Sequence, residues 1–294
     1  MAKRLEDFSP IVFDRRRFPG KKCTGIISRE TFLKLGVSKE YVDREFKDVR
    51  MVYGKKEIHF RVDVVRLNRE RLEKDLSREV KYVPGTNAEV RSENSLVVNG
   101  QKYEGFVVRA TGWDGKGRRV KAIEMVTEPI DGEEIVVYLD ERNVGGFSWI
   151  VPLPDRTLVG ALAYENPELF LPKVEKRVLE RHGGTIPRCK PRYVNLGIGD
   201  VLCTVKTFTG GGIYAISELL DTFKPLLEGG DSTEYRKKLK ALGREITRQY
   251  YLVRAVERAW KTSLKLGFSL LDGKTISVGR EFDLHSSLLG RLLH

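Results

Sequence analysis

The sequence predicts a mixed α/β protein with a β-rich insertion. Apolar strand patterns and helical patterns alternate along the 294 residues, and several strands in the middle are close enough in sequence to pair antiparallel. Hydrophobic residues make up 40% of the chain, which is enough to bury a core, and no internal repeat or low-complexity stretch interrupts it. A chain of this length forms one large domain or two interleaved ones.

Local capping and turn signals place the elements of the first third of the chain. A strand is expected where apolar residues are bounded by turn residues, and a helix begins at a side chain that can accept a backbone N–H. The predicted elements are a helix tail over 1–7, a strand over 11–13, a helix capped by Ser28, a hairpin over 50–65 turning at Gly54 and Lys55, and a helix capped by Asn68 with Leu72, Leu76 and Val80 on one face.

The clearest local signal lies at Asn99 and Gly100, the preferred pair for a two-residue hairpin turn. The apolar runs 96–98 and 106–108 flank this pair and are predicted to be the two strands of the hairpin. Further strands are predicted over 135–139, 147–151 and 157–163, and helices over 168–181 with a break at Pro172, over 211–225 and over 233–261.

Charge and cysteine content narrow the class of protein. A formal charge of +12 indicates either an anionic partner (nucleic acid, a phosphate-bearing cofactor or an anionic membrane) or solvated Lys and Arg faces. Three scattered cysteines, Cys23, Cys189 and Cys203, are too few for a disulfide framework or a zinc site, so a reducing cytoplasm is expected. Because no apolar run reaches the roughly 18 residues that span a membrane, we expect any membrane contact to be peripheral.

Asp14 ends the first apolar strand, where dinucleotide-binding folds place an acid that holds the adenosine ribose hydroxyls. A surface aspartate at a strand end is the alternative. In such folds a glycine-rich loop precedes the acid by about 20 residues, because a strand, a turn and a helix lie between them. Since 13 residues precede Asp14, we expect that loop to be missing from this sequence.

Two further motifs are candidates for ligand contact. Gly199 and Asp200 are followed by three consecutive glycines that begin at Gly210 and open an apolar helix. Glycines there allow a ligand to approach the backbone closely, and the start of a helix favours a phosphate or another negatively charged group. The alternative is a flexible turn that requires small residues. Alternation turns Phe147 and Trp149 to one face of their strand, which forms either the wall of an apolar pocket or ordinary core.

In order along the chain, these motifs resemble those of the geranylgeranyl reductases and their relatives among the p-hydroxybenzoate hydroxylase-like, FAD-dependent flavoproteins. The resemblance spans roughly residues 8–225, and the order of the motifs carries it, since no single motif is specific. The matching segments are 12–16 with 23–25, Arg66 ahead of Leu72 and Leu76, 109–115 in place of a hairpin-ending Ala-Asp-Gly, 147–152, Gly199 with Asp200, and 207–213.

The resemblance implies an incomplete FAD-binding Rossmann-like domain with an inserted antiparallel β-sheet substrate domain. The implied activity is reduction of isoprenoid double bonds by hydride transfer from reduced FAD, with the electron donor either NAD(P)H or a redox protein. The implied division is an FAD-binding domain of residues 1–48, 66–115 and 190–228, a β-rich substrate domain of 49–65 and 116–189, and a C-terminal helical region of 229–294.

Residue roles follow from the resemblance position by position, and none involves a metal. Cys23 would lie near the flavin ring as the catalytic residue. The cofactor-binding residues would be Asp14 at the adenosine ribose, its neighbour Arg15, Arg66 near the pyrophosphate, Gly199 and Asp200 at the ribityl or pyrophosphate region, and Gly210, Gly211 and Gly212 against the flavin. Phe147, Trp149 and Pro152 would line the channel for an isoprenoid or lipid substrate.

Departures from the family pattern leave other interpretations open. Besides the missing glycine loop, bulky residues at 201–203 replace small ones, Thr207 replaces a proline and Phe147 a tyrosine. One alternative is a catalytically inactive relative of this fold that binds a lipid or protein partner. Another is a nucleic-acid binder using the basic helix at 236–258 with Tyr250, Tyr251 and the nearby Trp260. A solvated amphipathic helix explains that segment more simply, so nucleic acid is the least favoured partner.

Overall fold

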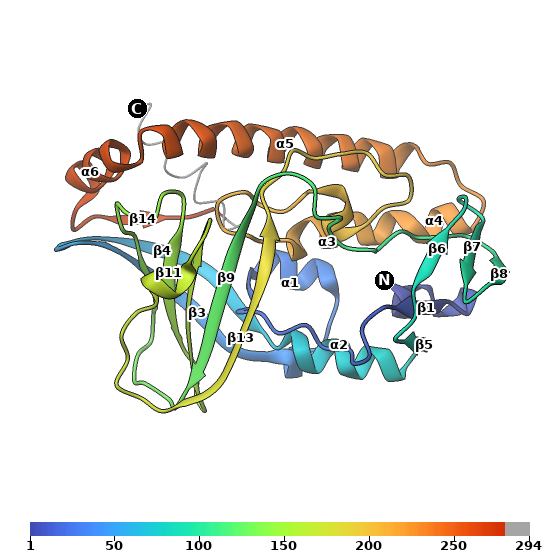
Figure 1. Cartoon of the computed structure of the whole chain (residues 1–294), viewed down its shortest axis with the longest axis horizontal. Coiled ribbons are helices and arrows are strands. Elements are labelled where there is room, and N and C mark those ends of the chain that lie inside the picture. The colour runs from blue at the N-terminus through green and yellow to red at the C-terminus, as the bar shows by residue number, and fades with distance from the viewer. Residues whose placement is uncertain (280–294) are drawn as a thin grey trace.

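The computed structural model describes residues 1–279, and its largest element is a nine-stranded sheet (Figure 1). From one edge to the other its strands are β13 (Val178–Pro187), β9 (Arg119–Thr127), β12 (Thr157–Ala163), β11 (Phe147–Pro152), β10 (Ile135–Tyr138), β3 (Val42–Tyr53), β4 (Lys56–Leu67) and β14 (Thr275–Ser277), with β2 (Ile26–Ser28) also paired to β4. The pairs β10–β3 and β14–β4 are parallel and the others are antiparallel.

The hairpin of β3 and β4 is the longest pairing in this sheet, and the alternation in its sequence explains its position. Phe60, Val62 and Val64 are buried while the residues between them are exposed, because one face of the strand lies on the core. The turn lies at Gly54, as predicted, where φ is +61° and favours glycine. Strand β14 adds an edge strand from the region predicted to be helical.

Helix α6 (Trp260–Leu271) packs on the core of this sheet. Its buried side chains Trp260, Leu264 and Phe268 recur every four residues, which places them on one helical face, and they belong to the same hydrophobic cluster as Phe60 and Val64. Burying an aromatic or aliphatic side chain of this size contributes about 1.5–3 kcal/mol, so this face holds the helix against the sheet.

A second group of elements lies beside the sheet. Ser28 and Asn68 cap their helices as predicted, since their side chains accept the backbone N–H groups of Thr31 and Arg71. The elements are β1 (Ile11–Asp14) parallel to β5 (Lys81–Pro84), a three-stranded antiparallel sheet of β6 (Ala88–Val90), β7 (Ser95–Val98) and β8 (Gln101–Glu104), and the helices α1 (Arg29–Leu35) and α2 (Arg69–Arg78).

The helices that follow residue 200 share a separate core with the N-terminal turn. Leu5, Leu202, Leu219, Phe223 and Tyr235 are buried together in this cluster. The helices are α3 (Ile213–Leu219), α4 (Phe223–Leu227) and α5 (Thr233–Arg258), and the short 3-10 helices of the chain are η1 (Ala2–Phe8), η2 (Lys39–Tyr41), η3 (Pro167–Phe170), η4 (Gly199–Leu202) and η5 (Leu220–Thr222).

The predicted helix over 168–181 is wrong. A 3-10 helix ends at Phe170, Pro172 lies in a connecting segment outside any helix or strand, and the chain then enters β13. Proline removes a helical hydrogen bond, and the long antiparallel pairing of β13 with β9 satisfies the backbone groups instead. Only the last four residues of the predicted helix, Val178–Arg181, are therefore strand residues, on the edge of the large sheet, and residues 171–177 are neither helix nor strand.

The second strand of the hairpin at Asn99 and Gly100 is also misplaced in the prediction. Both turn residues have positive φ, as the predicted turn type requires, and β8 starts directly after them at Gln101. A two-residue turn leaves no room for the partner strand to begin at Phe106. Residues 106–108 instead enter the core, and Arg109 forms an isolated parallel bridge with Gly197.

Candidate functional site

Three segments that are distant in sequence meet around Arg69, at the start of helix α2. Arg69 pairs with Glu73, and Cys23 and Asp200 both lie close enough to interact with its charge. Burial alone would lower the pKa of Arg69, but these three neighbours raise it. Lys21 Nζ lies 3.8 Å from Asp200 Oδ2. The loop of Cys23, the start of α2 and the turn of Asp200 therefore converge.

The loop of three glycines lies against the turn of Asp200. A Cβ at Gly212 would be 3.1 Å from Asp200 Oδ1, and Gly210 has a φ of +75°. In the same segment the hydroxyls of Thr204 and Thr207 are buried, and neither has a hydrogen-bond partner in the part of the chain that the structure describes. A buried hydroxyl without a partner costs about 1–3 kcal/mol, so this loop suits a ligand with hydrogen-bonding groups.

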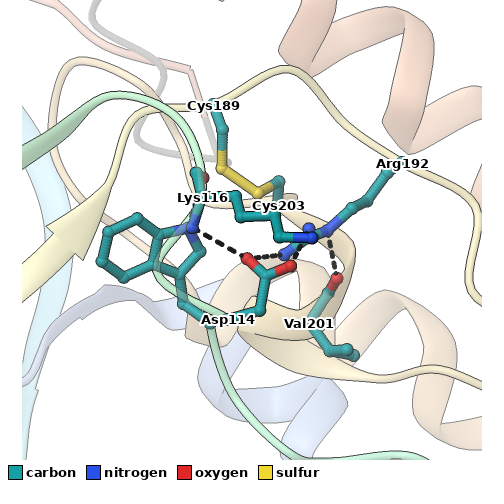
Figure 2. The surroundings of a disulfide bond; sticks show 7 residues. Asp114, Lys116, Cys189, Arg192, Val201 and Cys203 are labelled. Carbon is teal, nitrogen blue, oxygen red and sulfur yellow. Dashed lines mark hydrogen bonds and ion pairs between the residues drawn. A yellow bond between two sulfur atoms is a disulfide. The ribbon is translucent and has the colours of Figure 1, made fainter.

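A disulfide joins Cys189 to Cys203, directly after η4 (Figure 2). The Cα atoms are 5.8 Å apart, and the Cys203 N–H donates to the carbonyl of Asp200 at 3.1 Å. The three cysteines were predicted to be too few for a disulfide framework, yet two of them form this one bond. The two residues are 14 apart in sequence, and they meet because the chain turns back after β13, which their spacing does not reveal.

Arg192 holds the same turn through hydrogen bonds (Figure 2). Its guanidinium donates to both carboxylate oxygens of Asp114, at 2.6 and 2.8 Å, and to the carbonyl of Val201 at 2.8 Å. Hydrogen bonds from Arg192 and from the Lys116 backbone lower the pKa of Asp114 to about 2. The segment 109–115 and the turn of Asp200, two motifs of the predicted flavin site, are thus tied together.

Asp14 is already engaged by protein groups at the end of β1. Its carboxylate accepts from the Arg16 guanidinium at 2.9 Å and from the Tyr82 hydroxyl at 3.0 Å. Burial alone would raise the pKa of Asp14, but the bonds from Arg16 hold it below its ordinary value. Arg15 is exposed. A ribose at this strand end would have to compete with Arg16 and Tyr82 for the carboxylate.

A charged cleft of about 420 Å³ opens beside Cys23, between α2 and the strands β9, β12 and β13. Cys23 is a free, half-buried thiol. Arg66 lines the cleft as well; it is buried, forms an ion pair with Asp43 and donates to the carbonyl of Thr24 at 3.2 Å. The lining contains six Lys or Arg and four Asp or Glu side chains. The cleft therefore suits a polar or negatively charged group better than a hydrocarbon chain.

A hydrogen-bonded row crosses four strands of the large sheet at this cleft. His182, Glu124, Gly160 and Trp149 are register neighbours on β13, β9, β12 and β11. His182 Nε2 and Glu124 Oε1 are 3.0 Å apart, and Trp149 Nε1 donates to Glu124 Oε2 at 3.0 Å. The indole crosses Gly160, where a Cβ would be 2.2 Å from the ring. The hydroxyl of Thr24 donates to the same carboxylate and so docks the Cys23 loop on the sheet.

Glu124 and His182 were not predicted from the sequence, because no local motif marks two residues that are 58 positions apart. The hydrogen bond that His182 donates to the Glu124 carboxylate raises the pKa of His182, and Nδ1 of His182 has no hydrogen-bond partner among the described residues. A histidine with a raised pKa in a cleft is a candidate for proton transfer. Within residues 1–279, no three His, Cys, Asp or Glu side chains are grouped as metal ligands.

The residues predicted to bind substrate lie on β11, outside the charged cleft. The rings of Phe147 and Trp149 are 5.7 Å apart, and the ring of Phe147 is 6.0 Å from that of Phe208 in the glycine loop. Trp149 and Pro152 are buried in the sheet. Phe147 and Phe208 therefore form an aromatic contact between the large sheet and the glycine loop.

No protein-family model matches the sequence, and no curated protein is similar to it in sequence. A solved geranylgeranyl bacteriochlorophyll reductase-like protein from Thermoplasma acidophilum is 14% identical, with a TM-score of 0.77 over 97% of this chain and 89% of its own. PqsL, a probable FAD-dependent monooxygenase from Pseudomonas aeruginosa, is 16% identical, with a TM-score of 0.62 over 87% and 90%. A flavoprotein/dehydrogenase from Cytophaga hutchinsonii is 13% identical, with a TM-score of 0.58 over 99% and 89%. The chain thus has the predicted mixed α/β fold of such flavoproteins.

Proposed function

We propose that this chain is a flavin-dependent oxidoreductase that binds FAD where the Cys23 loop, the start of α2, the turn of Asp200 and the glycine loop converge. The observation that carries the proposal is this convergence, because each segment was singled out separately from the sequence. The fold shared with solved flavoproteins supports it.

The residues at this place fit a flavin dinucleotide. A Cβ at Gly211 would meet no atom nearer than 3.5 Å, so the backbone there is open to close approach. Thr204 and Thr207 hold buried hydroxyls that a ligand would satisfy. Lys21 and Arg69 supply positive charge close to Asp200, and such charge favours a pyrophosphate.

FAD, when bound, supplies hydride-transfer chemistry, and the protein supplies position, charge and a site protected from water. Cys23 lies on the wall of the cleft, on a loop held to the sheet by the bond from Thr24 to Glu124. Glu124 orients the His182 ring and holds a proton at Nε2, because the raised pKa favours the charged imidazolium. These groups can hold or move a proton at the cleft.

Within this class, the reaction that we propose is reduction of an isoprenoid double bond. Its support is the order of motifs shared with geranylgeranyl reductases and the aromatic surface of Phe147 and Phe208 beside the glycine loop. The cationic side chains of the cleft beside Cys23 would hold the polar end of the substrate. NAD(P)H and a redox protein are the two candidates for the electron donor.

The first test is the visible spectrum of the purified chain before and after incubation with FAD. Flavin bands at about 375 and about 450 nm that persist through gel filtration would support the proposal. Gly211→Val should lower FAD affinity at least about tenfold (about 1.4 kcal/mol), because the valine side chain would fill the space beside the backbone that FAD is proposed to occupy. Gly184→Val is the matched control, since a Cβ at Gly184 on β13 also meets no atom within 4 Å.

A relative of this fold that binds no flavin is the second candidate, and the engaged carboxylate of Asp14 favours it. A folded chain that takes up no FAD would overturn the oxidoreductase proposal in favour of this alternative. If FAD binds, the dithionite-reduced protein should be reoxidised by a geranylgeranyl substrate, with a saturated product seen by mass spectrometry. Cys23→Ser should then slow turnover while FAD binding is unchanged.

A further inference from the structure

Helix α5 carries a large share of the positive charge of the protein. It runs along one side of the molecule (Figure 1) and contains eight Lys or Arg residues against three Glu. The helix therefore contributes +5 to the formal net charge of +12. One 26-residue segment thus supplies much of the excess.

Six of these residues, here called the basic stripe, are exposed on the outer side of the helix: Arg236, Lys237, Lys240, Arg244, Arg248 and Arg258. The opposite side is buried through Tyr235, Leu239, Leu242, Ile246 and Val253. The stripe is about 33 Å long at 1.5 Å per residue.

The basic stripe is only weakly compensated within the described chain: Asp231, just before the helix, interacts with the charge of Arg236 without forming an ion pair. None of its six side chains forms an ion pair with another residue of 1–279; the basic residues of α5 that do form ion pairs are Lys238 and Arg254. All of α5 is described, and Glu234 in its first turn is the only exposed acid along it. Like charges four residues apart, such as Lys240 and Arg244, destabilise a helix, so the stripe is suited to an external anionic surface.

We propose that the basic stripe docks the protein on an anionic lipid surface. Lys and Arg residues close to such a surface bind it additively. Three large apolar or aromatic side chains are also exposed here: Tyr251 on α5, and Leu266 and Leu270 on α6, where Lys265 is exposed as well. Aromatic and apolar side chains insert at a lipid interface. The phosphate backbone of a nucleic acid, by contrast, offers exposed leucines no apolar surface to contact. No helix among residues 1–279 is long and apolar enough to cross a bilayer, so docking would be from the side.

This inference does not depend on flavin binding, and co-sedimentation with vesicles tests it. The protein should sediment with phosphatidylcholine vesicles that contain about 30% phosphatidylserine and not with phosphatidylcholine alone, and about 0.5 M salt should release it. The variant R236Q/K240Q/R244Q/R248Q should lose affinity between about 100- and 1,000-fold, since each neutralised residue costs about fivefold.

The matched control is K39Q/K55Q/K81Q/K121Q, which removes the same charge from exposed lysines outside α5 that form no ion pair with described residues. Its affinity should fall less than about tenfold, and circular dichroism should show both variants folded. Equal losses in the two variants, or no binding to the anionic vesicles, would overturn the proposal. Tighter binding to a mixed-sequence DNA duplex than to the vesicles, at equal phosphate concentration, would also overturn it and assign the stripe to nucleic acid.

Discussion

Removal of the bond between Cys189 and Cys203 should destabilise the protein by about 3 kcal/mol. The bond closes a loop with a sequence separation of 14, and the chain-entropy cost of closing a loop of about 15 residues is about 3 kcal/mol at 25 °C. The double variant C189A/C203A restores that freedom to the unfolded chain. The effect reaches the candidate site, because Gly199 and Asp200 lie inside the loop.

Urea unfolding followed by circular dichroism, without reductant, measures the effect. With a denaturant dependence of about 3 kcal/mol per molar, the midpoint of C189A/C203A should lie about 1 M below that of the wild type. The wild type treated with a phosphine reductant should unfold like the double variant. Cys23→Ala is the control, since Cys23 is a free thiol and its removal leaves the disulfide intact.

Equal midpoints for the wild type, the reduced wild type and C189A/C203A would refute the reasoning. A second readout separates local from global effects. If the disulfide positions the turn of Asp200, FAD affinity should fall in C189A/C203A under conditions in which both proteins remain folded. Unchanged affinity together with the expected loss of stability would show that Arg192 alone is enough to hold the turn.

Three further predictions concern the row at Glu124. Gly160→Ala should lower the free energy of unfolding by about 1–3 kcal/mol, because the new Cβ would be 2.2 Å from the Trp149 ring. An unchanged urea midpoint together with unchanged tryptophan emission would contradict this. The pKa of His182 is raised in the folded state, so its stabilisation is full below the unfolded pKa of about 6.5 and is lost as pH rises through the folded pKa. Relative to His182→Gln, the wild type should therefore lose stability as the pH rises from about 6.5 through the raised pKa of His182. Parallel curves of stability against pH for the two proteins would argue against the bond between His182 and Glu124. Glu124→Gln should return the pKa of His182 towards its ordinary value, as measured by NMR titration of the ring protons. An unchanged pKa of His182 in this variant would mean that groups other than Glu124 raise it.

Local sequence signals account for many of the individual elements. Ser28 and Asn68 cap helices because their side chains reach N–H groups only three residues away. The turn at Asn99 and Gly100 needs two residues that tolerate positive φ, and both adopt it. The order of the flavoprotein-like motifs agrees with a fold that solved flavoproteins share at 13–16% identity.

Tertiary structure alone decided the features that depend on pairing between distant segments. The first four residues of strand β13, Val178–Arg181, were predicted to be helical, because the extended form of the strand comes from hydrogen bonds to β9 rather than from its own residues. His182, Glu124 and Trp149 face one another only through the register of four strands. Cys189 meets Cys203 only because the chain turns back after β13. Short-range preferences are encoded in neighbouring residues, whereas register and chain reversal are set by the packing of the whole core.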